Sequence, residues 1–193
     1  MGPFYHSVNC ASRHLERLHI DVSGPEPIAN ADGSNYFVIV IEEYIQYVFV
    51  ELIKAKSEVK TVLIDFINHI ETYFFNENYK VSSIRSDNGG EYVVRELTQF
   101  WALHSIAQQF TIPRKPEQNG LFERMNWTLE EKACHLLIQA SLTEQLWGET
   151  ILAAAFIYNR IPSRTHGKCC WSLCLLRSTM LKVMCCQHVT LRH

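Results

Sequence analysis

The chain has 193 residues, 47% of them apolar, which is enough for one domain with its own core. Its net charge of −2 is unevenly distributed, because residues 151–193 contain Lys and Arg but no acid. No apolar run approaches the roughly 20 residues that cross a bilayer, and no signal-peptide pattern opens the chain. The composition therefore argues against a membrane-spanning or secreted protein and favours an intracellular one.

The first half of the chain predicts a leader followed by three strands. Residues 1–16 are polar and irregular. Apolar or alternating runs then predict strands over Arg17–Val22, Tyr36–Ile41 and Tyr47–Leu52. Because the connections between these runs are short, we expect an antiparallel meander.

A helix is predicted from Ser57 to about Asn76, since apolar residues recur there at three- and four-residue spacing. Its core-facing side chains are Val62, Phe66, Ile70 and Tyr73. The following segments predict a strand, a helix and a strand, over Val81–Ser86, Glu96–Leu103 and Ala107–Thr111. Such an order gives parallel neighbours joined by crossovers. The prediction is an α/β protein with a five-stranded mixed sheet, three strands antiparallel and the rest parallel, flanked by helices.

The C-terminal part predicts a loop, two helices and a divergent tail. Two prolines and a glycine predict a loop over Ile112–Gly120. A long helix follows, and another covers roughly Thr143–Asn159. Residues 164–193 are basic and hold five of the seven cysteines, none in a Cys-x-x-Cys pair. We therefore divide the chain into a leader (1–16), a core with C-terminal helices (17–163) and a poorly ordered tail (164–193).

Three acids stand at positions that suit metal-dependent chemistry. Asp21 ends the first strand, Asp87 ends the fourth, and Glu123 lies near the start of the long helix. Three carboxylates on a rigid scaffold can hold two divalent cations, which activate a nucleophile and stabilise the leaving oxygen of a phosphodiester. Each acid also has a structural explanation: Asp favours turns, and Glu in a first helical turn complements the helix dipole.

Four motifs carry a family resemblance: Arg85-Ser-Asp-Asn-Gly-Gly-Glu-Tyr92, Gln118-Asn-Gly-Leu-Phe-Glu-Arg-Met-Asn126, Leu146-Trp-Gly-Glu149 and Tyr158-Asn-Arg-Ile-Pro-Ser163. In this order they resemble the integrase catalytic domain of copia-type retrotransposon Pol polyproteins, over residues 17–163. The resemblance implies a ribonuclease H-like fold in which Asp21 and Asp87 lie on adjacent strands. It also implies DNA integration through 3′-end processing and strand transfer.

The same resemblance implies the site, its cofactor and its partners. Asp21, Asp87 and Glu123 would be catalytic and would hold two Mg²⁺ or Mn²⁺ ions. The residues expected to contact DNA are Asn88, Lys115, Gln118, Asn119, Arg124 and Asn126. The partners would be element ends and target DNA, together with further copies of the chain, and no membrane. Action on DNA implies a nuclear location.

The chain also departs from the family pattern. Members typically read Asp-Asp-Tyr-Ser-Arg where this chain has Glu42-Glu-Tyr-Ile-Gln46, and they carry Arg where it has Trp127 and Cys134. Fewer basic side chains predict weaker DNA binding. The alternative is a decayed or domesticated nucleic-acid-binding or interaction domain of an element. A third candidate is another nuclease of this fold, such as a ribonuclease H, whose usual fourth carboxylate has no evident counterpart in the sequence.

Overall fold

The computed structural model describes residues 11–73, 79–87, 89–110 and 116–162, except for the side chains of Tyr73 and residues 116–122. The tail over 164–193 and most of the predicted leader lie outside these residues. Within the leader, Leu15 is described and is buried in the core. Among the helices that the structure describes, none is long and apolar enough to cross a membrane.

Five strands form one mixed sheet in the order β3-β2-β1-β4-β5. The strands are β1 (Arg17–Ser23), β2 (Tyr36–Glu42), β3 (Tyr47–Ile53), β4 (Ser83–Ser86) and β5 (Ala107–Phe110). The pairs β1–β2 and β2–β3 are antiparallel, whereas β1–β4 and β4–β5 are parallel. The predicted fold class is confirmed, and this arrangement is that of the ribonuclease H-like fold.

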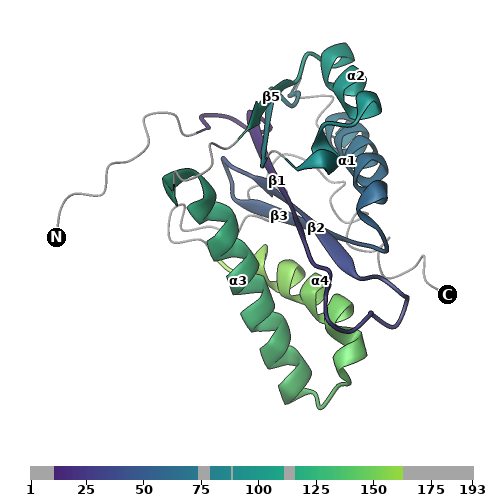
Figure 1. Cartoon of the computed structure of the whole chain (residues 1–193). Coiled ribbons are helices and arrows are strands. Elements are labelled where there is room, and N and C mark those ends of the chain that lie inside the picture. The colour runs from purple at the N-terminus through teal and green to yellow at the C-terminus, as the bar shows by residue number, and fades with distance from the viewer. Residues whose placement is uncertain (1–10, 74–78, 88, 111–115, 163–193) are drawn as a thin grey trace.

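Helices cover both faces of the sheet (Figure 1). The helices are α1 (Val59–Tyr73), α2 (Arg95–Leu103), α3 (Pro116–Gln139) and α4 (Trp147–Tyr158), with short 3-10 turns η1 (Lys56–Glu58), η3 (Gly90–Tyr92) and η4 (Glu144–Leu146). Helices α1 and α2 pack on one face, and α3 and α4 pack on the other. The sheet is therefore the middle layer of three.

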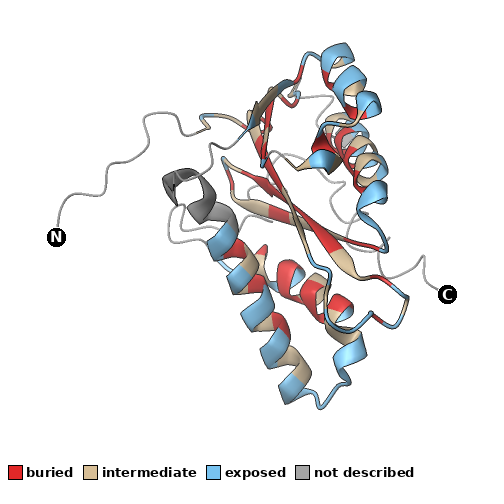
Figure 2. Ribbon diagram, in the orientation of Figure 1, coloured by how far each residue is buried: buried red, intermediate tan, exposed pale blue. Residues whose placement is uncertain are grey.

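Strand β2 is an unbroken apolar run because both of its faces are covered. Val38 and Val40 belong to the core beneath α1 and α2, whereas Phe37, Ile39 and Ile41 belong to the core beneath α3 and α4. All five side chains are at most 1% exposed, and Figure 2 shows the strand as buried. The two cores thus share the central strands of one sheet.

Helix α1 buries the face that its periodicity predicts. Phe66 and Ile70 are 5% and 7% exposed, and Val62 is partly buried against the same core. The helix begins later than predicted, because Lys56–Glu58 form the turn η1, whose N-cap is Ala55 without a side-chain bond. Residues 74–78, into which the prediction extended, are not among those described.

Helix α3 begins at Pro116, so the predicted loop up to Gly120 is wrong in its second half. A proline is tolerated in the first turn of a helix, because its missing N–H would have no intrahelical partner there. Met125, Leu129 and Ala133 then form the buried face of α3. They pack in one cluster with side chains of α4, namely Ile151, Ala154 and Ala155.

The motif Leu146-Trp-Gly-Glu149 attaches the start of α4 to the sheet. A Cβ atom on Gly148 would stand 2.6 Å from Cδ1 of Leu52 and 2.8 Å from Cγ of Asn30, so only glycine fits at this position without a shift. The backbone N–H of Gly148 donates to Oδ1 of Asn30 at 3.0 Å. The predicted helix over Thr143–Asn159 is found as η4 followed by α4, which starts at Trp147.

Candidate active site

Asp21 lies near the end of β1 and points to the α3 side of the sheet. Leu18 and Ile20 of this strand belong to the core beneath α1 and α2. Because side chains alternate along a strand, Asp21 lies on the opposite face. There its Oδ2 accepts a hydrogen bond of 3.0 Å from Nδ2 of Asn126 on α3.

Asp87 directly follows β4, the parallel neighbour of β1. The two strands pair Arg17 with Ser83 and His19 with Arg85. If this register is continued by two residues, Asp21 lies opposite Asp87. The Oδ1 atom of Asp87 accepts the backbone N–H of Gly89 at 3.0 Å, which fixes the carboxylate beside the turn. Parallel strands thus bring the two acids to the same end of the sheet.

The surroundings of Asp21 disfavour its negative charge. Its Oδ1 accepts the N–H of Val22 at 2.9 Å, and Asn126 bonds the other oxygen. Burial nevertheless raises the pKa of Asp21, and the charges of Asp87 and Glu91 raise it further. A partly buried carboxylate beside other carboxylates is a group that a cation would stabilise.

Glu123 is exposed on α3, one turn before Asn126. It therefore lies on the helix that contacts Asp21, but its side chain makes no hydrogen bond with a described residue. Within the described part of the chain, no three His, Cys, Asp or Glu side chains converge closely enough to hold a metal ion. The structure thus brings Asp21 and Asp87 to the same end of the sheet, and among the described residues Glu123 does not complete a three-ligand cluster with them.

A further acid, Glu91, lies at this site and was missed by the sequence reasoning. Its Oε2 and the Oδ1 of Asp87 lie 2.8 Å and 2.9 Å from the point that a Cβ on Gly89 would occupy. The turn η3 folds Glu91 back toward Asp87. Glu91 stands in the same motif as Asp87, so the sequence could have identified it as a candidate site residue. Glu91 is thus a carboxylate beside Asp87 that was not among the predicted site residues.

Of the residues expected to contact DNA, Asn88 follows Asp87 in the sequence, and the others lie on α3 or just before it. Asn88 and Lys115 lie outside the described residues, and Gln118 and Asn119 belong to the start of α3, where side chains are not described. Arg124 is exposed. Asn126 is half-buried and its amide bonds Asp21, so its described contact is with the site itself.

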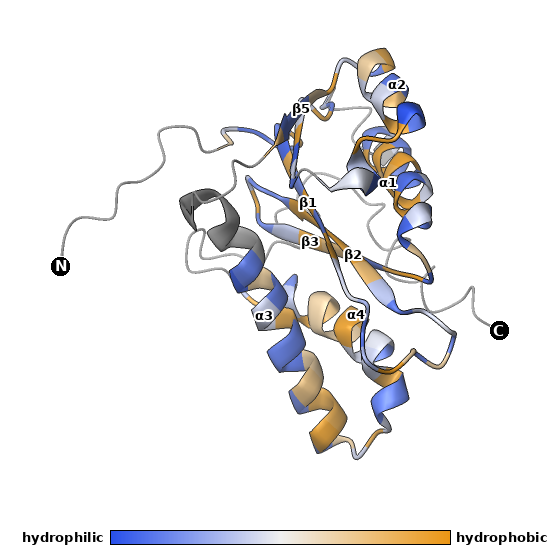
Figure 3. Ribbon diagram, in the orientation of Figure 1, coloured by the Kyte–Doolittle hydropathy of each residue, from blue (hydrophilic) through white to orange (hydrophobic). Residues whose placement is uncertain are grey.

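The positions where a basic residue is missing face solvent on α3. Trp127 is 67% exposed, and Cys134 is exposed and free. Ile138 is 71% exposed near the end of the helix, whose C-terminal part is coloured as hydrophobic in Figure 3. Substitution by Trp and Cys therefore changes the exposed surface of the helix rather than its packing.

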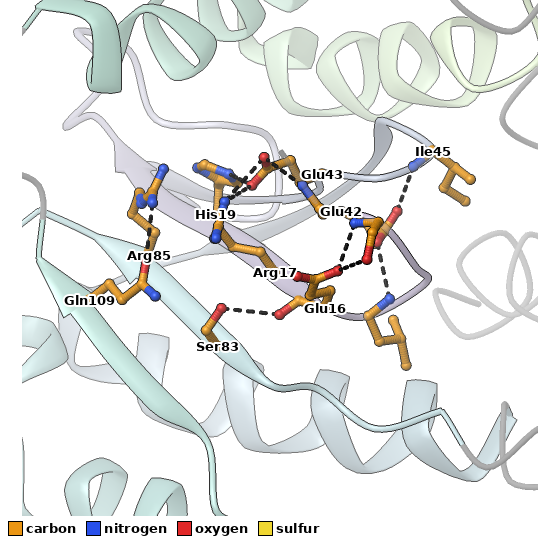
Figure 4. Close-up of polar contacts among 12 residues, drawn as sticks. Glu16, Arg17, His19, Glu42, Glu43, Ile45, Ser83, Arg85 and Gln109 are labelled. Atoms are coloured by element: carbon orange, nitrogen blue, oxygen red, sulfur yellow. Dashed lines mark hydrogen bonds and ion pairs between the residues drawn. The ribbon is translucent and has the colours of Figure 1, made fainter. Parts of the chain in front are cut away.

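A second polar cluster on the same face of β1 has a structural role. Figure 4 shows Glu43 beside Arg17 and His19: its Oε2 lies 3.0 Å from Nη1 of Arg17 and 2.8 Å from Nε2 of His19. Burial opposes ionisation of Glu43, yet its bonds with His19 and Arg17 outweigh it and lower the pKa to about 2. This cluster ties the residue that follows β2 to the first half of β1.

Comparison with known proteins places the chain among transposon sequences. It is 36% identical over 149 residues to the retrovirus-related Pol polyprotein from transposon TNT 1-94 of Nicotiana tabacum. It is 33% identical over 161 residues to each of those from transposons RE1 and RE2 of Arabidopsis thaliana. These matches cover 77% to 83% of the chain but only 11% of each polyprotein, so the chain spans a small part of its relatives.

A solved structure has the same fold. A chain of the simian T-cell lymphotropic virus intasome, determined in complex with PP2A regulatory subunit B56 gamma, superposes with a TM-score of 0.68 at 18% identity. The match covers 91% of this chain and 59% of that one. No protein-family profile matches the chain.

Proposed function

Because the chain belongs to the family of retrovirus-related Pol polyproteins of plant transposons, we propose that it is the integrase catalytic domain of such an element. Its reaction would be metal-dependent polynucleotidyl transfer, in which a DNA end is processed and joined to target DNA. The observation that carries this proposal is the side-by-side position of Asp21 and Asp87 at the ends of parallel β1 and β4. The likeness to a chain of an intasome supports it.

The chemistry of the donor set fits a divalent cation of the magnesium type. Asp21 and Asp87 offer hard carboxylate oxygens, and burial together with the charges of Asp87 and Glu91 raises the pKa of Asp21. These two residues would hold Mg²⁺ or Mn²⁺, with Glu123 as the third ligand once α3 brings it inward. When bound, two such ions supply activation of a water or DNA 3′-hydroxyl and stabilisation of the leaving oxygen.

The chain's own residues would prepare this site. The N–H groups of Val22 and Gly89 each orient one carboxylate, and Asn126 keeps α3 against Asp21. Arg124, exposed one residue after Glu123, would contact DNA phosphates. The partners would be element ends, target DNA and further copies of the chain, and action on chromosomal DNA would take place in the nucleus.

The test is strand transfer with labelled element-end DNA and Mn²⁺. We expect joined products with the unchanged chain and at least a hundredfold less with Asp21→Asn, Asp87→Asn or Glu123→Gln, because each removes a charged ligand. Glu131→Gln is the matched control, since Glu131 is exposed on the same helix. Equal activity of Glu123→Gln and the unchanged chain would refute the assignment of Glu123.

A second candidate is a nucleic-acid-binding or interaction domain that has lost catalysis. The exposed Trp127 and Cys134 favour it, because these positions on α3 carry no charge that could bind phosphate. Strand transfer measured together with DNA binding distinguishes the two functions. DNA binding without any joined product, unaffected by the three acid substitutions, would support the second candidate.

A further inference from the structure

An ion pair beside Asp87 is not used by the proposed function. Nζ of Lys56 lies 3.0 Å from Oε1 of Glu91. Lys56 belongs to η1, after β3, and Glu91 belongs to η3, after β4, so the pair joins two segments at the site. The Lys56 side chain is 47% exposed, whereas that of Glu91 is 13% exposed. The lysine can therefore leave toward solvent more easily than the glutamate.

Glu91 extends the negative charge of the site. Its other oxygen, Oε2, and the Oδ1 of Asp87 share the space beside Gly89 that a Cβ would fill. The charge of Glu91 also acts on Asp21, and the charge of Lys56 acts on Asp87 as well as on Glu91. Three carboxylates and one ammonium group are thus electrostatically connected in this part of the fold.

The hydroxyl of Tyr92 is a buried polar group that the charges of the site act on. Tyr92 is 3% exposed, and its hydroxyl has no hydrogen-bond partner among the described residues. Burial raises the pKa of Tyr92, and the charges of Asp21, Asp87 and Glu91 raise it further, so the hydroxyl lies within their field. A buried polar atom without a partner is costly unless a ligand or an ordered water meets it.

We propose that Glu91 and Lys56 set the charge of the Asp21–Asp87 site, Glu91 by attracting a divalent cation and Lys56 by competing with it. This inference rests on the proposed function, since it requires a cation beside Asp21 and Asp87. When the cation binds, it replaces Lys56 as the counter-charge of Glu91, and the half-exposed ammonium group turns to solvent. Exposed ion pairs are weak, so the exchange costs little.

Binding of Mn²⁺ to the full chain, followed by isothermal titration calorimetry at low salt, tests this role without DNA. We expect Glu91→Gln to weaken Mn²⁺ binding about tenfold or more, because a unit charge is removed within a few ångströms of the cation. Lys56→Gln should strengthen binding about threefold to fivefold, because the cation then reaches Glu91 without breaking the ion pair with Lys56. The double variant should lose the gain that Lys56→Gln gives alone, because Lys56 competes through Glu91.

The chain contains a matched control pair. Nζ of Lys60 lies 3.1 Å from Oε1 of Glu96, an ion pair on α1 and α2 with side chains 37% and 58% exposed. Lys60→Gln and Glu96→Gln make the same charge changes and should leave the Mn²⁺ affinity within about twofold of that of the unchanged chain. Circular dichroism spectra of all variants verify that each one is folded.

The outcomes separate this inference from the proposed function. If the unchanged chain binds no Mn²⁺ at millimolar concentration, the proposed metal site is wrong and the inference falls with it. If Asp87→Asn abolishes binding while Glu91→Gln and Lys56→Gln leave it unchanged, the metal site stands and only the inference is wrong. Equal effects of the Lys56 and Lys60 substitutions would also overturn it, since a general charge effect would then explain both.

Discussion

The side chain of Asn159 pairs with the backbone of Val48 as a neighbouring strand would. Its Oδ1 accepts the N–H of Val48 at 2.9 Å, and its Nδ2 donates to the Val48 carbonyl at 2.7 Å. Asn159 follows α4, Val48 lies in β3, and both are at most 4% exposed. This amide therefore closes the edge of the sheet at β3 and attaches α4 to it.

We expect Asn159→Ala to lower the free energy of unfolding by roughly 2–5 kcal/mol, because a buried donor and a buried acceptor of Val48 lose their partners. Asn159→Asp should also destabilise the protein, since a carboxylate can accept from the N–H but cannot donate to the carbonyl. Urea titration measures both. Gln145→Ala, at an exposed position of η4, is the control. A cost of Asn159→Ala as small as that of the control would contradict this role.

The core beneath α1 provides a second prediction. Phe66 is 5% exposed, and its ring centroid lies 4.5 Å from that of Phe49. Phe66→Ala should lower the free energy of unfolding by about 3–5 kcal/mol, because transfer energy is lost and a cavity remains. Leu103→Ala, at a side chain 82% exposed, should change it by less than about 0.5 kcal/mol. A loss below about 1 kcal/mol for Phe66→Ala, in denaturant titration, would show that this face is not core.

The framework of the fold was predictable because its signals are local. Apolar runs and turn residues define β1, β2 and β3 to within a residue at their ends, and helical spacing identifies the buried face of α1. The start of α3 was not predictable in this way. In the sequence Pro116 indicates a loop, but proline is also compatible with the first turn of a helix.

The site could be predicted only in part, because its geometry depends on contacts between distant segments. The parallel pairing of β1 and β4 explains why Asp21 and Asp87 meet. The bond from Asn126 to Asp21 and the return of Glu91 toward Asp87 arise from helix placement and a 3-10 turn. No spacing rule encodes these contacts. The position of Glu123 relative to the two aspartates likewise depends on how α3 packs. The motif that contains Glu123 does not determine this packing.

Glu43 should make the protein sensitive to acid. Its pKa is lowered in the folded state to about 2 despite burial, because His19 and Arg17 bond the ionised carboxylate. A lowered folded pKa means that the stabilisation is present above the unfolded value of 4.5 and is lost as the pH falls toward 2. Glu43→Gln should therefore cost about 1.5–3 kcal/mol at pH 6, as for bonds to a charged group.

The check is the free energy of unfolding of Glu43→Gln and of the unchanged chain, measured by urea titration from pH 6 down to pH 2. The difference between them should stay nearly constant from pH 6 to about pH 5 and then shrink as the pH falls to 2. A difference that stays constant with pH would mean that Glu43 stabilises through packing rather than through its charge.

The neighbouring residue, Glu42, should have the opposite pH dependence. Its side chain is buried, with Oε1 accepting the N–H of Leu15 at 3.1 Å and Oε2 accepting that of Ile45 at 2.8 Å. Figure 4 shows the bond from Ile45 to Glu42, with Glu43 next to it. Burial nevertheless dominates and raises the pKa of Glu42 to about 7, above the unfolded value of 4.5. The stabilisation is then fully present below pH 4.5 and is lost as the pH rises through 7.

The unchanged chain should therefore lose up to about 3 kcal/mol of stability relative to Glu42→Gln between pH 5 and pH 8, at 1.4 kcal/mol for each unit of pKa shift. The comparison is relative, because Gln leaves one backbone N–H without an acceptor and carries its own constant cost. Urea titrations of both proteins at several pH values measure the difference. If that difference is flat across this range, or if it grows in favour of the unchanged chain, the carboxylate of Glu42 is ionised throughout and its bonds to Leu15 and Ile45 outweigh its burial.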